Sequence, residues 1–586
     1  MKPLPPHLTG AHFLLAETDP AEVFTPEELP TEERQIVETA QKFMDKEVLT
    51  RIDELEHQEE GLSVKLFKQL GELGLHTLEV PESHGGLGLG KTVGAGVAAQ
   101  FSRLGGFGVT YGAHNGIGTM PLTYFGTDEQ KDRYLGKLAT GELMAAYCLS
   151  ETGSGSDALG MKTRATLSED GKHYVLNGTK MWISNAAWAD LFTVFAKVDG
   201  EHVTAFLVER TYPGVSFGKE EHKLGIKSSS TRRVILEDVK VPVENVLGGV
   251  GKGAYIAFNI LNFGRFGLGA GAVGGSIEMI RTATKYAQER HQFGRPIASF
   301  GLIQQKLGEM AARTFAVESA TYRTAAMIDA VMATGEMLDL TDPPFPRGLE
   351  EFAIECSALK VACSEALFHV VDEGLQIHGG YGFSEEYSPA RATRDARINR
   401  IFEGTNEINR LFIPSTLLRR AQRGRFELPK TGPQAPAAAS GEPLDRAAAL
   451  LQGAKQLSLW LMGLSFQKFG KELVEQQEVA AAISDVVIEI FLDESALLRT
   501  KKTLANGKPG GTMTDLTLSL MNDSVSLMEN RATLVLAACC SGDELEKSLG
   551  LVRKLLAWTP VNAVELRRRV AARLCEVETY TALVAG

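Results

Sequence analysis

The sequence predicts an α+β protein in which a central β region lies between two helical regions and a further helical domain follows a linker. Apolar residues recur with helical spacing before residue 145 and again from residue 253, whereas residues 145–252 hold short runs rich in β-forming residues. Residues 425–443 are rich in proline, glycine and alanine, which is typical of a linker. A chain of 586 residues also exceeds what one hydrophobic core supports, so several domains are expected.

The first part of the chain is predicted to be helical after a short extension. Residues 1–30 are rich in proline and have no clear period, so we expect them to lie along the surface. Helical spacing begins at Glu33 and recurs over residues 64–73, 93–103 and 128–138, which predicts an N-terminal helical domain over residues 31–144. His84 lies in a glycine-rich turn cluster and is interpreted as a turn residue rather than a ligand.

The central region has the pattern of a β domain over residues 145–252. Its β-rich runs cover residues 163–166, 173–176, 191–198, 203–208 and 234–241. The dipeptide of Asp199 and Gly200, placed between two of these runs, is a strong signal for a β-hairpin.

Helical spacing then continues over residues 253–424. The segment 269–274 (GAGAVG) fits the GxGxxG pattern, but this fingerprint binds a dinucleotide only between a strand and a helix. Because the preceding apolar residues are spaced as on a helix, we interpret these small residues as a site of close helix packing. A nicotinamide-dependent enzyme is thereby disfavoured. Residues 444–586 are predicted to form an additional helical domain, broken at residues 506–511 and at Pro560.

Composition excludes several classes of function. The net charge of -12 argues against a nucleic-acid-binding protein, whose footprint is basic. The six cysteines form no CxxC pair and have no metal-ligand spacing, so we expect free, mostly buried thiols and no metal site. No signal peptide and no apolar run of ~18 residues are visible. We therefore expect a cytoplasmic protein.

Glu403 is the candidate catalytic residue. The segment 401–406 (IFEGTN) precedes a stretch with helical spacing, so Glu403 is expected just before a helix. Ile401 and Phe402 surround the acid with apolar bulk, and Gly404 leaves the backbone open to a ligand. Desolvation raises the pKa of a glutamate above its usual ~4.3, toward the range of a general base. The alternative is an exposed acid that favours the positive end of a helix dipole.

Two segments of the β region have the composition of a ligand site. Residues 147–157 (YCLSETGSGSD) alternate glycines with hydroxyl residues, which suits a polar, planar or phosphorylated ligand, although many ordinary loops look similar. Residues 181–185 (MWISN) alternate as in a strand and include Trp182, which is either a ligand contact or a core tryptophan.

Three arginine- or glycine-rich segments follow. In residues 290–296 (RHQFGRP), Arg290 suits a pyrophosphate or, alternatively, a helix C-terminus. In residues 376–382 (QIHGGYG), the glycines allow close approach of a phosphate or, alternatively, cap a helix. A third segment repeats arginine every three residues and is interpreted as a solvated or salt-bridged face without a ligand, at Arg391, Arg394, Arg397 and Arg400.

Residues 401–408 (IFEGTNEI) resemble the catalytic segment of the acyl-CoA dehydrogenases, and the resemblance covers roughly residues 30–420. It implies the fold of that family, with an N-terminal helical domain, a central β-barrel-like domain and a C-terminal four-helix bundle. The reaction implied is FAD-dependent α,β-dehydrogenation of a fatty acyl-CoA, in which Glu403 takes the α-proton, a β-hydride goes to the flavin and an electron-transferring flavoprotein accepts the electrons. Gly264 stands where some branches carry the glutamate, which leaves Glu403 as the candidate base.

The resemblance also assigns contact residues. The cofactor contacts implied are Tyr147, Leu149, Ser150, Trp182, Ser184, Arg290, Gln292, Phe293, Gln376, Gly379, Gly380, Thr405 and Glu407. The substrate contacts implied are Ser156, Arg265, Gly404, Phe402 and Gly112. In the family, residues matching Arg290, Phe293 and Gln376 complete the flavin site of a partner subunit. A homodimer, or a dimer of dimers, is therefore expected, and a soluble dimer is favoured over one bound to a membrane surface.

The added helical domain, together with Phe402 and Gly264, looks like the very-long-chain branch of the family. Residues 106–115 match the helix that floors the acyl pocket in relatives. There, Gly108, Gly112 and Ala113 either leave room for a long chain or allow close helix packing. Two other functions share this fold: an acyl-CoA oxidase that passes electrons to oxygen, and a non-catalytic assembly scaffold. The retention of Glu403 and of the flavin residues favours turnover.

Overall fold

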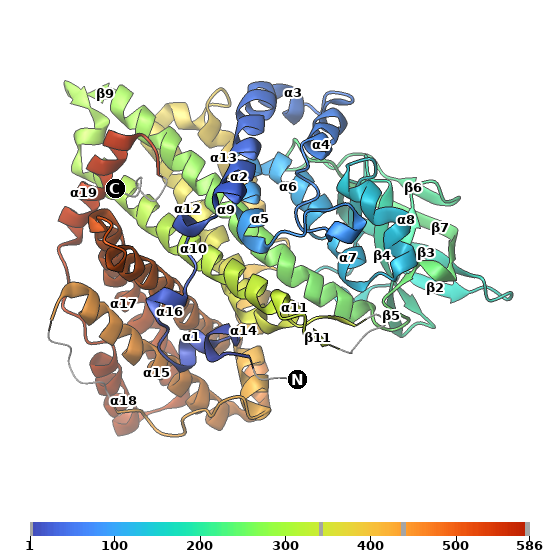
Figure 1. The fold of residues 1–586 in the computed structure, drawn as a ribbon. Coiled ribbons are helices and arrows are strands. Elements are labelled where there is room, and N and C mark those ends of the chain that lie inside the picture. Colours follow the sequence, from blue (N-terminus) through green and yellow to red (C-terminus); the bar gives the residue numbers. More distant parts are fainter. Residues whose placement is uncertain (1–3, 339–343, 435–440, 581–586) are drawn as a thin grey trace. The chain divides into compact units, whose positions relative to one another are not determined.

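The computed structural model describes residues 4–338, 344–434 and 441–580 (Figure 1). Pro436 of the predicted linker and the extreme ends of the chain lie outside the described residues. The fold divides into two compact units. One, the β-containing unit, comprises residues 29–274 and 328–351, and the other, the helical unit, comprises residues 2–28, 275–327 and 352–586. The two long helices α9 (Gly253–Glu289) and α10 (Gly301–Ala333) contribute residues to both units.

The β-containing unit begins with the predicted helices. They are α2 (Thr31–Phe43), α3 (Ile52–Glu56), α4 (Leu62–Glu72), α5 (Lys91–Phe101), α6 (Gly105–Asn115), α7 (Met120–Phe125) and α8 (Asp128–Ala139). A capping box fixes the start of α8, because Thr127 and Gln130 each bond the other's backbone N–H. The apolar faces of these helices share a core that includes Leu66, Val97 and Phe101, each less than 1% exposed.

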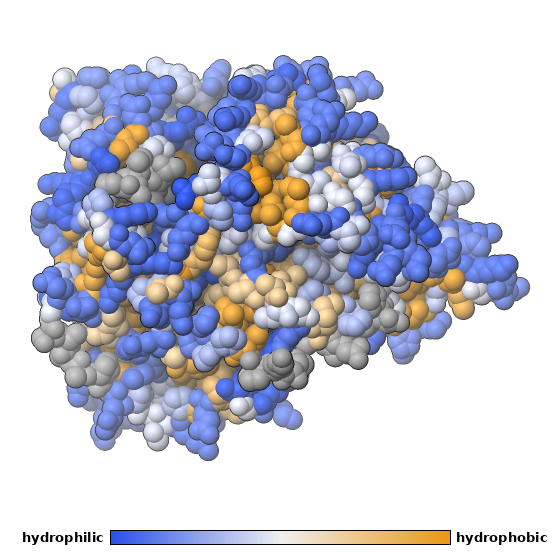
Figure 2. All heavy atoms as spheres, in the orientation of Figure 1, coloured by the Kyte–Doolittle hydropathy of each residue, from blue (hydrophilic) through white to orange (hydrophobic). Residues whose placement is uncertain are grey.

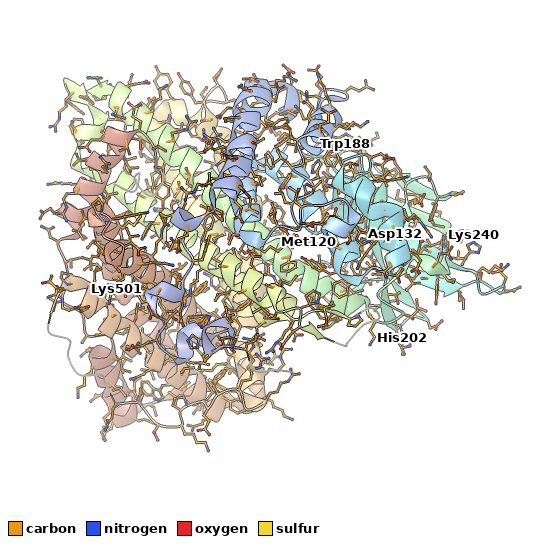
Figure 3. The ribbon with its side chains drawn as sticks, viewed as in Figure 1. Met120, Asp132, Trp188, His202, Lys240 and Lys501 are labelled. Carbon is orange, nitrogen blue, oxygen red and sulfur yellow. The ribbon has the colours of Figure 1, made fainter. Side chains whose placement is uncertain are left out.

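The predicted β domain is one eight-stranded sheet. Its strands are β1 (Ala145–Cys148), β2 (Arg164–Leu167), β3 (His173–Ser184), β4 (Leu191–Val198), β5 (His202–Glu209), β6 (Val215–Phe217), β7 (Thr231–Pro242) and β8 (Val246–Leu247). They pair in the order β6-β7-β3-β2-β4-β5-β8, and β1 also pairs with β4 in parallel. Asp199 and Gly200 both have positive φ, at 53° and 76°, which confirms the tight β-hairpin turn. His202 and Lys240 of this sheet, labelled in Figure 3, are exposed.

The GxGxxG segment lies inside α9 and packs against α5. A Cβ at Gly274 would lie 1.9 Å from the carbonyl oxygen of Ala99, and a Cβ at Gly271 would lie 2.5 Å from Ser102 Oγ. Neither glycine can therefore carry a side chain without displacing its neighbour. The prediction that these small residues serve close helix packing is confirmed.

The helical unit combines parts of α9 and α10 with the helices from α12 onward. These are α12 (Ala353–His378), α13 (Ser388–Arg397), α14 (Asn406–Gln422), α15 (Pro443–Phe469), α16 (Gln477–Ala505), α17 (Gly511–Cys539), α18 (Gly542–Leu555) and α19 (Ala563–Val577). The predicted break at residues 506–511 ends at the first residue of α17, and Pro560 falls between α18 and α19. From α15 onward these helices form the additional helical domain.

The N-terminal extension differs from its prediction. It forms the short helix α1 (His12–Leu15), whose Phe13 and Leu14 are each 2% exposed. The ring of Phe13 lies 4.7 Å from that of Phe491 on α16. The expectation that this segment lies along the surface is therefore wrong for α1, because its apolar side chains complete the core of the additional helical domain.

Hydrophilic side chains dominate the visible face, and hydrophobic residues gather there in small groups (Figure 2). Among the described residues, no helix combines the length and apolar character needed to cross a membrane. All six cysteines carry free thiols, and every one except the half-buried Cys575 is buried.

Candidate active site

Glu403 lies in a turn between the short helical segment η11 (Ile398–Arg400) and α14. Its φ is +58°, and that of the following Gly404 is +79°. A non-glycine residue adopts this left-handed backbone rarely, and such conformations concentrate at functional sites. Glu403 and its neighbour Phe402 are both half-buried. The predicted base therefore has a backbone conformation that the surrounding residues must hold in place.

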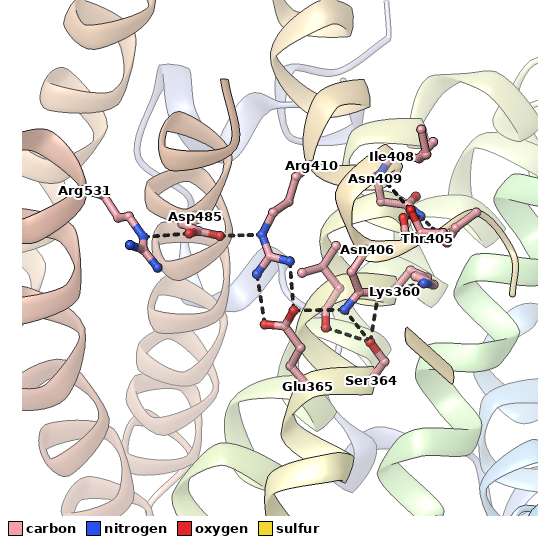
Figure 4. Close-up of polar contacts among 12 residues, drawn as sticks. Lys360, Ser364, Glu365, Thr405, Asn406, Ile408, Asn409, Arg410, Asp485 and Arg531 are labelled. Carbon is pink, nitrogen blue, oxygen red and sulfur yellow. Dashed lines mark hydrogen bonds and ion pairs between the residues drawn. The ribbon is translucent and has the colours of Figure 1, made fainter. Parts of the chain in front are cut away.

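Two side chains of the α14 region hold this turn. Thr405 Oγ1 accepts a hydrogen bond from the backbone N–H of Ile408 at 3.2 Å and so caps the helix. The buried Asn409 donates from Nδ2 to the carbonyl oxygens of Gly404 at 2.9 Å and of Thr405 at 3.0 Å (Figure 4). Glu403 is thus fixed from the C-terminal side by the first turns of α14.

On the β-containing unit, a buried ion pair supports the Ser/Gly loop that follows β1. Lys180 Nζ, which is fully buried, donates to Glu151 Oε1 at 2.7 Å and to the carbonyl oxygen of Leu149 at 3.2 Å. Burial works to raise the pKa of Glu151, but hydrogen bonds from Lys180 and Thr163 outweigh it, so the pKa lies below its usual value. Tyr147 and Leu149, predicted to contact the cofactor, are each 8% exposed.

Sequence reasoning missed this ion pair. Lysine is almost never fully buried without a partner, so nothing local marks Lys180 as an internal residue. The signal available was Glu151, an acid within a loop otherwise made of glycine and hydroxyl residues.

A β-bulge places Trp182 outside the core. The pairing of β3 with β7 shifts register just before Ile183, and Trp182 has φ +64° and is 57% exposed. Of the two alternatives for Trp182, the core tryptophan is therefore excluded. The backbone N–H of Met181 donates to the carbonyl oxygen of Ser150 at 2.9 Å, which brings the loop after β1 beside this strand. Ser184, at the end of the strand, is half-buried.

The segment after α9 is a tight hairpin on the helical unit. Its strands are β9 (His291–Gln292) and β10 (Arg295–Pro296), and the turn residues Phe293 and Gly294 have φ +52° and +79°. The side chain of Phe293 is almost fully in solvent, with the residue 93% exposed. The hairpin thus presents Gln292 and Phe293 outward.

Arg290 joins this hairpin to the glycine-rich segment after α12. Its guanidinium lies over the ring of Tyr381, 5.5 Å from the ring centroid. Gln376, Gly379 and Gly380 are exposed, and a Cβ at either glycine would meet no heavy atom of the described chain within 4 Å. A cation therefore lies beside backbone that a ligand can approach closely.

Of the predicted substrate contacts, Arg265 is 6% exposed and donates from Nη1 to Asn262 Oδ1 at 3.0 Å. Ser156 is exposed in the loop after β1, and Glu407, a predicted cofactor contact, is exposed on α14. The two glycines of α6 differ from one another. A Cβ at Gly112 has open space, with no described atom within 4 Å, whereas a Cβ at Gly108 would lie 2.6 Å from Ser102 Oγ. Gly108 serves helix packing, and Gly112 leaves room.

The contacts bring the predicted residues into three groups. The loop after β1 and the bulge of β3 present an aromatic ring and hydroxyl groups, which suit a planar ring system. The hairpin and the glycine-rich segment after α12 present a guanidinium beside open backbone, which suits a phosphate. The third group is the carboxylate of Glu403 in its turn. Within the described residues, no cluster of three or more histidine, cysteine, aspartate or glutamate residues is placed to hold a metal ion.

Comparison with known proteins identifies related domains over most of the chain. Family profiles described as the N-terminal, middle and C-terminal domains of acyl-CoA dehydrogenase match residues 30–142, 146–239 and 251–418, and a second acyl-CoA dehydrogenase C-terminal profile matches residues 453–554.

Individual relatives agree with these profiles. A probable acyl-CoA dehydrogenase of Bacillus subtilis is 45% identical over 98% of both chains. The crystal structure of an acyl-CoA dehydrogenase from Bacillus anthracis, complexed with FAD, is 47% identical and superimposes with a TM-score of 0.93 over 98% of this chain and 100% of that one. The human mitochondrial very long-chain specific acyl-CoA dehydrogenase is 42% identical over 65% of this chain and 56% of its own length. With these matches spanning both units, the chain belongs to the acyl-CoA dehydrogenase family of flavin-dependent oxidoreductases.

Proposed function

We propose that this protein is an FAD-dependent dehydrogenase that converts long-chain fatty acyl-CoA thioesters to trans-2-enoyl-CoA, the first step of β-oxidation. The observation that carries this proposal is the turn of Glu403, a carboxylate held at φ +58° by the amide of Asn409 and the cap of Thr405. Backbone strain of this kind costs stability and is found mainly at functional sites, so a strained glutamate that neighbouring residues hold in place supports a catalytic role.

The residues present fit FAD. The exposed ring of Trp182 and the adjoining Tyr147–Ser150 segment suit the isoalloxazine, and Arg290 with the open backbone of Gly379 and Gly380 suits the pyrophosphate. In the reaction, FAD supplies the hydride acceptor. The same cofactor is bound by the similar B. anthracis enzyme.

Proton transfer is the task of Glu403 in this proposal. Its carboxylate accepts the α-proton of the thioester, and its own backbone N–H donates to the thioester carbonyl oxygen, where negative charge develops. Gly264, at the position that carries the base in some relatives, has no side chain that can replace it. Arg265, Ser156 and Gly112 are assigned to the substrate.

We infer two protein partners. An electron-transferring flavoprotein accepts the electrons, as the family resemblance implies. A second copy of this chain receives Arg290, Phe293 and Gln376 at its flavin site. The 93% exposure of Phe293 supports the second inference, because a side chain this apolar gains from burial in a partner.

The decisive experiment is anaerobic addition of palmitoyl-CoA to the purified flavoprotein, followed by air. Loss of flavin absorbance on addition, with slow recovery in air, supports a dehydrogenase. Recovery in air as fast as turnover identifies an oxidase instead. A flavin-loaded protein whose absorbance does not change with any acyl-CoA from butanoyl to stearoyl is not an enzyme of this class, and the assembly scaffold then becomes the better interpretation.

A further inference from the structure

A chain of charged contacts runs from the additional helical domain to α12 (Figure 4). Asp485 of α16 accepts from Arg531 Nε and from Arg410 Nε, each at 2.7 Å, through its two oxygens. The other two nitrogens of Arg410 donate to the two carboxylate oxygens of Glu365 at 2.8 and 2.9 Å. Arg410, on α14, is therefore held on one side by α12 and on the other by α16.

The first residue of α14 is fixed by the same part of α12. Asn406 accepts from Lys360 Nζ at 2.6 Å and donates to Glu365 Oε1 at 2.9 Å and to Ser364 Oγ at 3.1 Å. Asn406 is 1% exposed and Lys360 is fully buried. A shift of the start of α14 would break these buried hydrogen bonds, which is costly in a site that water does not reach.

These contacts converge on the turn of α14 that follows Glu403. In this turn Asn406 bonds to α12, Asn409 bonds to the carbonyl groups of residues 403–405, and Arg410 bonds to both α12 and α16. Ser484, the neighbour of Asp485 on α16, donates its hydroxyl to the backbone carbonyl oxygen of Arg410. The support that the strained turn of Glu403 needs thus comes partly from the additional helical domain.

The pair of Glu365 and Arg410 favours its charged form. Burial works to raise the pKa of Glu365, but hydrogen bonds and charge from Arg410 outweigh it and hold the pKa below its usual value. Bidentate arginine–carboxylate pairs fix orientation as well as distance. Loss of the Asp485 charge would leave Arg410 and Arg531 facing a neutral group, so the Arg410 side chain would lose its charged partner on α16, and only the hydrogen bond from Ser484 would still join α16 to Arg410.

We propose that Asp485 is a positioning residue for Glu403, and that the additional helical domain fixes the location of the base through Arg410. This inference rests on the proposed role of Glu403. The domain thereby contributes to the rate of the reaction without touching the substrate.

The test compares two conservative variants of the full-length flavoprotein. Asp485→Asn removes the charge and keeps the shape. Asp515→Asn is the matched control, because Asp515 pairs with Arg569 at 2.5 Å in the same domain, between α17 and α19. We expect Asp485→Asn to lower kcat by about 5- to 50-fold, since small displacements of a reacting group are costly, while KM for palmitoyl-CoA stays within about twofold. Flavin content should be unchanged, and Asp515→Asn should keep wild-type kcat.

A second readout isolates proton transfer from hydride transfer. An acyl-CoA analogue with sulfur at its β position has no β-hydride to lose, so exchange of its α-protons with deuterated solvent reports the base alone. We expect this exchange to slow in Asp485→Asn in proportion to kcat, and Asp485→Glu to restore part of it. Wild-type rates in Asp485→Asn, or equal losses in Asp485→Asn and Asp515→Asn, would overturn the inference.

Two further variants keep these outcomes interpretable. If Asp485→Asn does not yield folded flavoprotein, Ser484→Ala replaces it. This variant removes the hydrogen bond from α16 to the carbonyl oxygen of Arg410, and the same changes in kcat, KM and α-proton exchange are expected. If Glu403→Gln turns over at the wild-type rate, the proposed function itself fails. An inactive Glu403→Gln together with a fully active Asp485→Asn overturns the role of Asp485 alone.

Discussion

The position of the Glu403 carboxylate depends on its backbone. With φ at +58°, the side chain leaves the chain in a direction that ordinary helical or extended geometry would not give. Asn409 stabilises this conformation by donating to the carbonyl groups that follow Glu403. Replacing Glu403 by another residue of the same shape therefore tests its chemistry without releasing the turn.

We predict that Glu403→Gln retains bound FAD and the wild-type melting temperature but loses dehydrogenation by about 10² to 10⁴, the usual contribution of a general base. Steady-state turnover with palmitoyl-CoA and an artificial electron acceptor measures this. A flavin-loaded variant that keeps more than about a tenth of wild-type turnover would show that another group takes the proton.

We predict that the side chain at position 112 limits acyl-chain length. Gly112 has open space around its Cβ position, so Gly112→Glu should fold and should block the far end of the pocket. Each excluded methylene costs up to ~0.8 kcal/mol, or about fourfold in kcat/KM, so the optimum should move to shorter chains.

The measurement is kcat/KM across saturated acyl-CoAs from butanoyl to stearoyl. Gly550→Glu is the control, because Gly550 lies on α18 and its Cβ position is also open. A wild-type optimum at butanoyl or hexanoyl, or an unchanged profile in Gly112→Glu, would contradict the assignment of α6 to the pocket.

At the scale of single residues, the sequence suggested candidate site residues but did not indicate the directions of their side chains. The alternation around Trp182 correctly predicted a strand, but a one-residue bulge reverses the face on which a side chain lies, and no local pattern marks the bulge. The pairing of Lys180 with Glu151 was not predictable either, because the two residues meet only when β3 returns past the loop after β1.

Among single elements, α16 is unusual because it carries a fully buried acid, Asp493, and a half-buried acid, Glu489, one turn apart. Asp493 is fully buried and accepts a hydrogen bond from Ser524 at 3.0 Å, and Glu489 lies on the same side of the helix. Burial raises the pKa of both carboxyl groups, and the charge of Glu489 raises that of Asp493 further. In the folded protein both carboxyl groups therefore favour their protonated, neutral form.

We predict that this pair makes stability decrease as pH rises. A carboxyl group with a raised pKa in the folded state holds its proton after the unfolded chain has lost it, so its contribution is present below the unfolded pKa of ~4.3 and is lost as pH rises through the folded pKa. Glu489→Gln removes one titrating group. Its melting temperature should therefore fall less than that of the wild type between about pH 5 and pH 8. Parallel curves for the two proteins would contradict this.

Elements with strong local patterns were predicted closely. The strand β4 has the predicted bounds, the turn of Asp199 and Gly200 forms the predicted hairpin between β4 and β5, and α14 ends at Gln422, close to the predicted end of the helical region at residue 424. The helix α1 was not predicted, because four residues do not define a period and its burial depends on partners more than four hundred positions away.

For the whole molecule, the exposed apolar residues of the helical unit support the assembly that we propose. Phe293, Leu302 and Phe383 are 93%, 75% and 85% exposed. Exposure of three large apolar side chains to water is unfavourable in a monomer, and burial in a partner would remove that cost. The sequence could suggest this assembly only through its family resemblance, since no periodic pattern distinguishes an interface residue from a loop residue.

We predict that Arg290→Ala lowers FAD occupancy and the melting temperature together, because bound cofactor stabilises the folded assembly by mass action. Arg281→Ala is the control on α9, the helix that Arg290 directly follows, where Arg281 forms an ion pair with Glu278 one turn away. Absorbance at the flavin band, thermal unfolding and light scattering are the measurements. A flavin-loaded monomer of wild-type protein, or normal occupancy in Arg290→Ala, would contradict the proposed exchange between subunits.

The burial of α1 has a consequence for the protein during its synthesis. Arg499 of α16 binds Glu27 of the N-terminal extension, and these two residues are 472 positions apart. At about 5–20 residues per second, a ribosome needs roughly 25–95 s to make the intervening chain. For that time the native partner of Phe13 on α16 is not yet made, so we expect chaperones or transient contacts to cover the apolar side chains of α1. Translation that stops before α16 leaves Phe13 without Phe491, so we expect the truncated chain to be more prone to degradation or aggregation than the complete one.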